Sequence, residues 1–389
     1  MSKRSPLPED LVPPSAPAGE TADRRQFRRR VAVNVGISLG VGTVFGYLAF
    51  RGLRPGELGK AFAGADYRWL APYLASLAAV QLFRAWRWRF LLEPIAPVRP
   101  SFGRLFAISS VGFGAIILLP FRLGEFVRPF LIADPAPAPG APAGAPRLSA
   151  SAAFGTVALE RVVDGLLVSL FLFISFWFLA DRPGSPGWMM SMAYTALGVF
   201  GGATVFLVAG LARPALAVDL ALKLSLISLL SRRLGGRWTR IEATLRGLLD
   251  GLIRGLSALF QARCLTAFVV LSLLYWIFNG LGFWLLARAF HLDLPLWHAY
   301  AICGVVVVGI ILPTGPGLVG NFHEFGRLGL QLGLPAAVVA GSGMAYIVAC
   351  HGLQFIWYVG LGLLCLRSRH VSLRRLLQAA RGQAPTAEG

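Results

Sequence analysis

Eight apolar stretches, each at least 20 residues long, dominate this chain of 389 residues. About 20 consecutive apolar residues in a helix are enough to cross the hydrocarbon core of a bilayer. Charged residues make up only 14% of the chain, against about 25% in soluble domains. The sequence therefore predicts an all-α fold, a polytopic transmembrane helical bundle. The stretches cover residues 31–50, 69–92, 105–132, 152–180, 188–211, 265–290, 297–325 and 336–366.

Two of these stretches contain helix breakers. The stretch 105–132 is broken at Pro120 and Gly124, and the stretch 297–325 is broken from Pro313 onward by Pro-Thr-Gly-Pro-Gly. Breaks inside a bilayer are tolerated only where protein or a water-filled cavity covers the freed backbone groups. Both breaks also follow a similar Ile-Leu-Pro run and precede a Gly and a Glu-Phe pair. Matching broken segments in two halves indicate an inverted repeat of the kind found in transporters.

The distribution of arginine sets the expected topology. Basic residues concentrate in the tail 1–30, in the amphipathic segment 213–262 and in the tail 367–389, and basic segments stay on the cytoplasmic side. About six full spans plus two re-entrant helical hairpins place all three segments inside. We expect a transmembrane domain over 31–366, interrupted by a Pro/Ala linker at 133–149.

The strong positive charge fits a membrane surface. The net charge is +19, and anionic headgroups attract such basic segments, so we expect no nucleic-acid partner. The four cysteines form no C-x-x-C pair, and no Walker A, H-E-x-x-H or G-x-S-x-G motif occurs. We therefore expect no metal and no cofactor.

The first polar constellation follows the break at Pro120. Arg122, Glu125 and Arg128 are spaced by three residues and share one face if the segment is helical. A guanidinium matches a phosphate group through two parallel hydrogen bonds, so the segment is a candidate for binding a lipid headgroup. The alternative is a hairpin tip at the membrane surface, where the arginines reach water.

The second constellation lies a few residues into the stretch 152–180. Glu160 and Asp164 face the same side of a helix, and Arg161 stands beside them. Ionisable groups within a span usually face a bundle interior or a cavity. They could pair with the arginines of the first constellation or carry a coupling proton; alternatively, the helix starts later and they are solvated.

The third constellation follows the second break. Gly317 and Gly320 allow close approach of backbones, and His323 and Glu324 are candidates for proton movement or for an ordinary histidine–glutamate pair.

At these motifs the sequence resembles the lysylphosphatidylglycerol synthase transmembrane-region family, also described as flippase-like. The likeness rests on Leu-Pro-Phe-Arg-Leu-Gly-Glu-Phe-Val-Arg at 119–128, Glu-Arg-Val-Val-Asp at 160–164 and Pro-Thr-Gly-Pro-Gly-Leu-Val-Gly-Asn-Phe-His at 313–323. The resemblance implies a helical bundle with re-entrant elements. Bifunctional members of the family move aminoacylated phosphatidylglycerol between leaflets and carry a soluble aminoacyltransferase domain, which we expect to be absent here.

The leading hypothesis is therefore an integral membrane, flippase-like lipid transporter rather than an enzyme. Its partner would be an anionic phospholipid or a polyprenyl-phosphate-type lipid, with a membrane protein partner or a homo-oligomer also open. The alternatives are an accessory subunit of a membrane lipid or cell-envelope glycan pathway and an enzyme acting on lipid-linked substrates. The expected location is the bacterial inner membrane, with both termini cytoplasmic.

Overall fold

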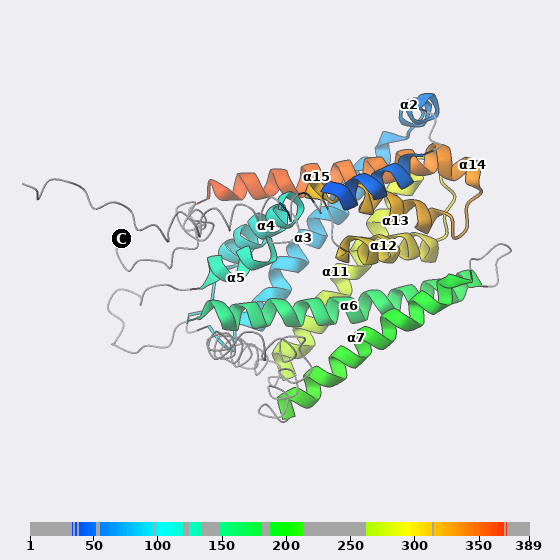
Figure 1. Cartoon of the computed structure of the whole chain (residues 1–389). Helices are drawn as coiled ribbons and strands as arrows, with labels where there is room; N and C mark the ends of the chain where they lie inside the picture. Colours follow the sequence, from blue (N-terminus) through cyan, green and yellow to red (C-terminus); the bar gives the residue numbers. More distant parts are fainter. Residues whose placement is uncertain are drawn as a thin grey trace, which may run out of the picture.

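All secondary-structure elements in the described part of the chain are helices (Figure 1). The computed structural model describes residues 33, 36, 39–51, 55–96, 98–119, 124–133, 148–180, 187–212, 262–312, 315–368 and 371. The N-terminal tail, Arg122 and Pro313 lie outside these residues, as do most of the predicted linker, of the basic segment 213–262 and of the C-terminal tail.

The helices follow the predicted apolar stretches closely. A helix over Leu39–Phe50 comes first. The others are α2 (Pro55–Ala63), α3 (Leu70–Leu92), α4 (Phe102–Leu118), α5 (Val127–Ile132), α6 (Ala150–Ala180), α7 (Trp188–Ala212), α11 (Ala262–Ala289), α12 (Leu296–Ile311), α13 (Asn321–Leu330), α14 (Ala336–Val338) and α15 (Met344–Leu366). Within the described residues, three helical segments are long and apolar enough to cross a membrane: Ala150–Ala180, Arg263–Ala289 and Ala336–Leu366. The six-span count stays a prediction.

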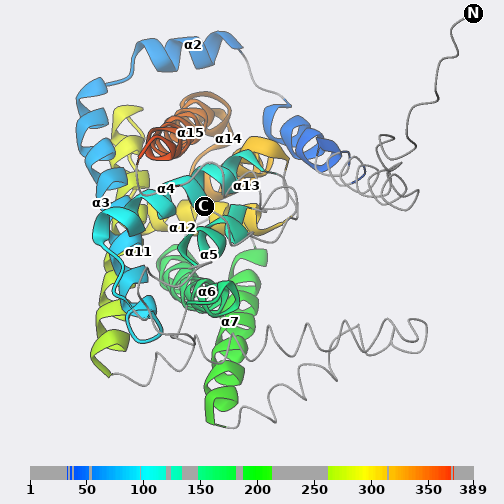
Figure 2. The ribbon, with the colours of Figure 1, turned by 90° about the vertical axis from the view of Figure 1, so that its left-hand side faces the viewer.

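The helices pack as neighbouring pairs around a shared core. α3 packs along α11, α15 along α4, α6 along α7 and α12 along α13. α6 and α15 lie lengthwise in Figure 1 and are seen nearly end-on in Figure 2, with α12 between them. The largest apolar core joins α3, α6, α11, α12 and α15. A second core joins α3, α4, α5 and α6 near one end of the bundle.

The first broken stretch folds back on itself as an antiparallel pair of helices. α5 returns along α4, so that Arg128 contacts Gly112 and Gly124 contacts Ile116. A Cβ atom at Gly124 would lie 2.1 Å from the backbone nitrogen of Ile116. Only glycine allows so close an approach of two backbones.

The second broken stretch makes a similar antiparallel pair. Asn321 at the start of α13 donates a hydrogen bond to the carbonyl of Gly309 in α12, at 3.1 Å. Gly320 turns the chain with a φ of +91°, and its α-carbon faces the carbonyl of Gly42 in the first helix. The breaks therefore lie where the sequence predicts them, and the re-entrant placement of the two hairpins in a bilayer stays a prediction.

Candidate functional site

Arg87 of α3 is the centre of a buried ionic cluster. Its Nη1 atom lies 2.5 Å from Oδ1 of Asp164, and its Nη2 atom lies 2.5 Å from Oε1 of Glu160. Both carboxylates come from α6, where a spacing of four residues places them on one helix face. Arg87 and Glu160 are completely buried, and Trp276 of α11 donates a further hydrogen bond to Asp164 at 2.9 Å. The cluster thus connects α3, α6 and α11 through charge.

Arg128 of α5 brings the first hairpin into this cluster. Its Nη1 atom lies 2.9 Å from Oε2 of Glu160, and its guanidinium stacks 4.2 Å from the ring of Trp88. The side chain of Arg128 is 1% exposed. The pairing of Arg128 with a carboxylate of the second constellation, one of the predicted alternatives, is present in the structure.

Arg161 forms the exposed side of the cluster. Its Nη2 atom lies 3.4 Å from Glu160 and 3.5 Å from Asp164, and its Nε atom lies 3.6 Å from Glu125. Glu125 belongs to the short turn before α5 and contacts Arg161 across the gap between the hairpin and α6. Arg122 lies outside the described residues, so the helical face shared by Arg122, Glu125 and Arg128 stays a prediction. Glu125 contacts Arg161, whereas Arg128 contacts Glu160.

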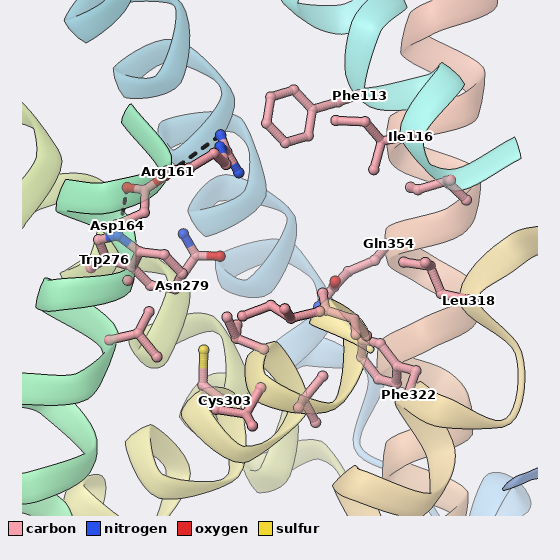
Figure 3. Close-up of a pocket in the computed structure, with 18 of the residues that line it drawn as sticks. Phe113, Ile116, Arg161, Asp164, Trp276, Asn279, Cys303, Leu318, Phe322 and Gln354 are labelled. Carbon is pink, nitrogen blue, oxygen red and sulfur yellow. Dashed lines mark hydrogen bonds and ion pairs between the residues drawn. The ribbon is translucent and has the colours of Figure 1, made fainter. Parts of the chain in front are cut away.

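A cavity of about 450 Å³ opens beside Arg161. Asp164, Arg161 and Glu125 form its charged wall, while most other side chains around it are apolar (Figure 3). Both broken stretches contribute to its lining, which includes Ile116 and Ile117 from the first and Ile310, Ile311 and Leu318 from the second. The cavity therefore lies between the two hairpins, and α6 contributes Arg161 and Asp164 to its charged wall.

The third constellation lies beside the cavity and reaches it through His351. The Nε2 atom of His351 lies 2.8 Å from the carbonyl oxygen of Gly317, and its Nδ1 atom lies 3.4 Å from Nε2 of His323. Because a carbonyl only accepts, Nε2 of a neutral His351 carries the proton, and His323 then donates to Nδ1. The backbone N–H of Gly320 points at Nδ1 of His323 at 3.5 Å. This chain of contacts holds the second broken segment against α15.

The predicted alternative of a pair between His323 and Glu324 is not what the structure shows. Both of its oxygens contact Arg327, three residues later on α13, at 2.5 and 2.8 Å. Residues three apart on a helix are neighbours on its surface, so Glu324 pairs with Arg327 and not with the histidines.

The structure thus divides the predicted site residues into three groups. Glu125, Arg161 and Asp164 line the cavity, whereas Arg128 and Glu160 are fully buried behind its charged wall. Gly317, Gly320, His323 and Glu324 are not among the residues that line it. Within the described residues no group of histidine, cysteine and carboxylate side chains has a geometry that would hold a metal ion.

Two arginines of α3 were missed by the sequence analysis. Arg84 and Arg87 stand three residues apart in a helix of apolar character, on one face. Charged residues within an apolar span are by default candidates for a functional site, so the sequence contained a signal for both. Apart from Gln81, three residues before Arg84, their partners come from segments 73 to 191 residues away, which the sequence does not bring together.

Comparison with known proteins gives one clear result. The family model described as lysylphosphatidylglycerol synthase TM region matches residues 33–362. No curated protein and no solved structure matches the sequence.

Proposed function

The chain belongs to the lysylphosphatidylglycerol synthase TM region family, and we propose that it moves an anionic lipid between the two leaflets of a bacterial inner membrane. Family membership and the long apolar helices identify it as a multi-pass membrane protein tied to lipid handling. The transport of the lipid and its anionic headgroup are the proposal.

The single observation that carries the proposal is the cavity between the two hairpins. Broken helices that meet at one cavity are typical of transporters, where they expose backbone groups to the substrate. A volume of about 450 Å³ falls in the range of about 300–1,000 Å³ typical of small-molecule sites. Its mixture of a charged wall and an apolar remainder suits a molecule with an ionic head and hydrocarbon chains.

The charged wall suggests separate roles for its members. Arg161 is the most exposed arginine of the cluster, with 30% of its side chain accessible, and it touches all three carboxylates. We assign to Arg161 the contact with the lipid headgroup. We assign to Glu125 and Asp164 the orientation of the Arg161 guanidinium. Arg87 and Arg128 hold the carboxylates in place from behind.

An enzyme acting on lipid-linked substrates is supported less well. It would need an acid and a base beside the substrate, and Glu160 and Asp164 were the candidates. Glu160 is completely buried and lies within 3.4 Å of three arginines. Glu160 therefore has no access to a substrate in the cavity, and Asp164, which lines it, lacks Glu160 as the second group of an acid–base pair.

Leaflet exchange in proteoliposomes tests the proposal. Fluorescent phosphatidylglycerol is reconstituted with the wild-type protein, and the label in the outer leaflet is quenched with dithionite. We expect exchange well above that of empty liposomes, and at least a tenfold loss with Arg161→Gln or Glu125→Gln. Exchange no faster than in empty liposomes, with a polyprenyl-phosphate probe also negative, would contradict transport.

A matched pair of bulky substitutions tests whether the cavity is the route. Val308 lines the cavity, whereas Val199 on α7 is 61% exposed on the outside of the bundle. Val308→Trp should block exchange because the indole fills the cavity, and Val199→Trp should leave it unchanged. Equal rates in the two variants would place the lipid elsewhere.

A further inference from the structure

Arg84 is a buried cation at the same cavity. It lies on α3, one turn before Arg87, and its side chain is among those that line the cavity. The residue is 3% exposed, so the guanidinium is held within the protein.

Arg84 forms no ion pair with a carboxylate in the described part of the chain. The carboxylates Glu125, Glu160 and Asp164 contact Arg87, Arg128 and Arg161. These three arginines and three carboxylates balance in charge. Arg84 therefore adds one net positive charge to the described residues around the cavity.

The groups to which Arg84 donates hydrogen bonds are neutral, as are the described rings that lie against its guanidinium. Its Nη1 atom donates to Oε1 of Gln81 at 2.9 Å, and its Nη2 atom donates to the hydroxyl of Tyr275 at 3.1 Å. The rings of Phe113 and Tyr358 lie 3.5 and 4.9 Å from its guanidinium carbon. The Nε atom is buried and has no hydrogen-bond partner. Taking a charge out of water costs several kcal/mol, which neutral neighbours offset only in part.

We propose that Arg84 binds the phosphate group of a lipid that occupies the cavity. A guanidinium binds phosphate through two parallel hydrogen bonds, and a bound phosphate would give Arg84 the anionic partner that the described residues do not provide. The apolar walls indicate that the rest of the ligand is hydrocarbon. Asn279 and Gln354 also line the cavity, and Figure 3 shows their amides between the charged wall and the second hairpin, where they offer neutral hydrogen bonds.

This site rests on the proposed function for its ligand, but its test needs no leaflets. Purified protein in detergent is titrated with fluorescent phosphatidylglycerol and with fluorescent diacylglycerol of the same chains, which lacks the phosphate. We expect wild type to prefer phosphatidylglycerol by about 10- to 100-fold, the worth of a charge-assisted hydrogen-bonded pair. Arg84→Gln should lose this preference and keep its affinity for diacylglycerol.

Two further variants control the result. Arg89→Gln makes the same change on α3 at a residue that does not line the cavity, and it should keep the preference. Arg84→Lys keeps the charge without the planar guanidinium, so it covers the case in which Arg84→Gln does not fold. We expect this variant to lose part of the preference for phosphatidylglycerol. Unlabelled inorganic phosphate at millimolar concentration should displace less than a tenth of the lipid; full displacement would assign the site to free phosphate and overturn a lipid ligand.

The two proposals fail in different ways. If folded Arg84→Gln binds phosphatidylglycerol as selectively as wild type, or if wild type shows no preference, the phosphate site is wrong, whatever the leaflet exchange shows. If the preference depends on Arg84 but proteoliposomes show no exchange, the phosphate site stands and transport is wrong.

Discussion

The substitution Arg87→Met should strongly destabilise the protein. It leaves Glu160 and Asp164 buried without the cation that both of them contact at 2.5 Å. At an effective dielectric constant of about 20, two unit charges about 4 Å apart attract by about 4 kcal/mol. Arg87 forms two such pairs, and the cost of burying its own charge offsets part of their attraction. The expected loss in the free energy of unfolding is about 3–5 kcal/mol, as for other buried pairs deprived of one partner.

Unfolding by sodium dodecyl sulfate in mixed micelles, followed by circular dichroism, measures this loss. Arg68→Met serves as control, because the side chain of Arg68 is 91% exposed and pairs with Asp66 at the surface; its transition should not move. The double variant Arg87→Met/Asp164→Asn should lose less than the sum of the two single losses, by about 0.5–3 kcal/mol. A wild-type transition for Arg87→Met would refute the view that this ion cluster holds the helices together.

Three further substitutions test individual contacts. Gly124→Val should abolish the monodisperse peak in size-exclusion chromatography, because the Cβ atom of the valine would overlap the backbone of α4. Gly198→Val on α7, with open space around it, should be tolerated, and equal yields of monodisperse protein from the two variants would contradict the hairpin packing. Trp276→Phe removes the hydrogen bond to Asp164 and should cost about 1.5–3 kcal/mol in the same unfolding titration; no change would mean that the bond is not formed. His351→Phe keeps a ring but loses its bond to the second broken segment, so leaflet exchange should slow at least threefold, and an unchanged rate would show that this anchor is dispensable.

The helices and the breaks could be predicted because both are local properties of the sequence. The stretch 188–211 became α7 (Trp188–Ala212), since an apolar run of this length leaves little choice of structure. The helix α4 ends at Leu118, just before Pro120 in the sequence, and Gly124 packs against the backbone of Ile116, so the break lies where proline and glycine predict it. Membership of the family, predicted from three short motifs, is confirmed by the match over residues 33–362.

The partners of the charged residues could not be predicted from local pattern. Spacing correctly placed Glu160 and Asp164 on one helix face, but the arginine between them comes from α3, more than 70 residues earlier. His323 likewise meets His351 rather than its neighbour Glu324, because the hairpin returns α13 to α15. Such pairs depend on tertiary packing, which periodicity does not encode.

We expect the cavity between the two hairpins to hold the lipid. Photocrosslinking with a diazirine-bearing phosphatidylglycerol, followed by peptide mass spectrometry, tests it directly in reconstituted protein. We expect crosslinks at cavity-lining residues such as Phe113, Leu318 and Phe355, and we expect Val308→Trp to remove them. Crosslinks confined to outward-facing residues such as Trp177 and Ile356, which are 63% and 69% exposed, would contradict the claim.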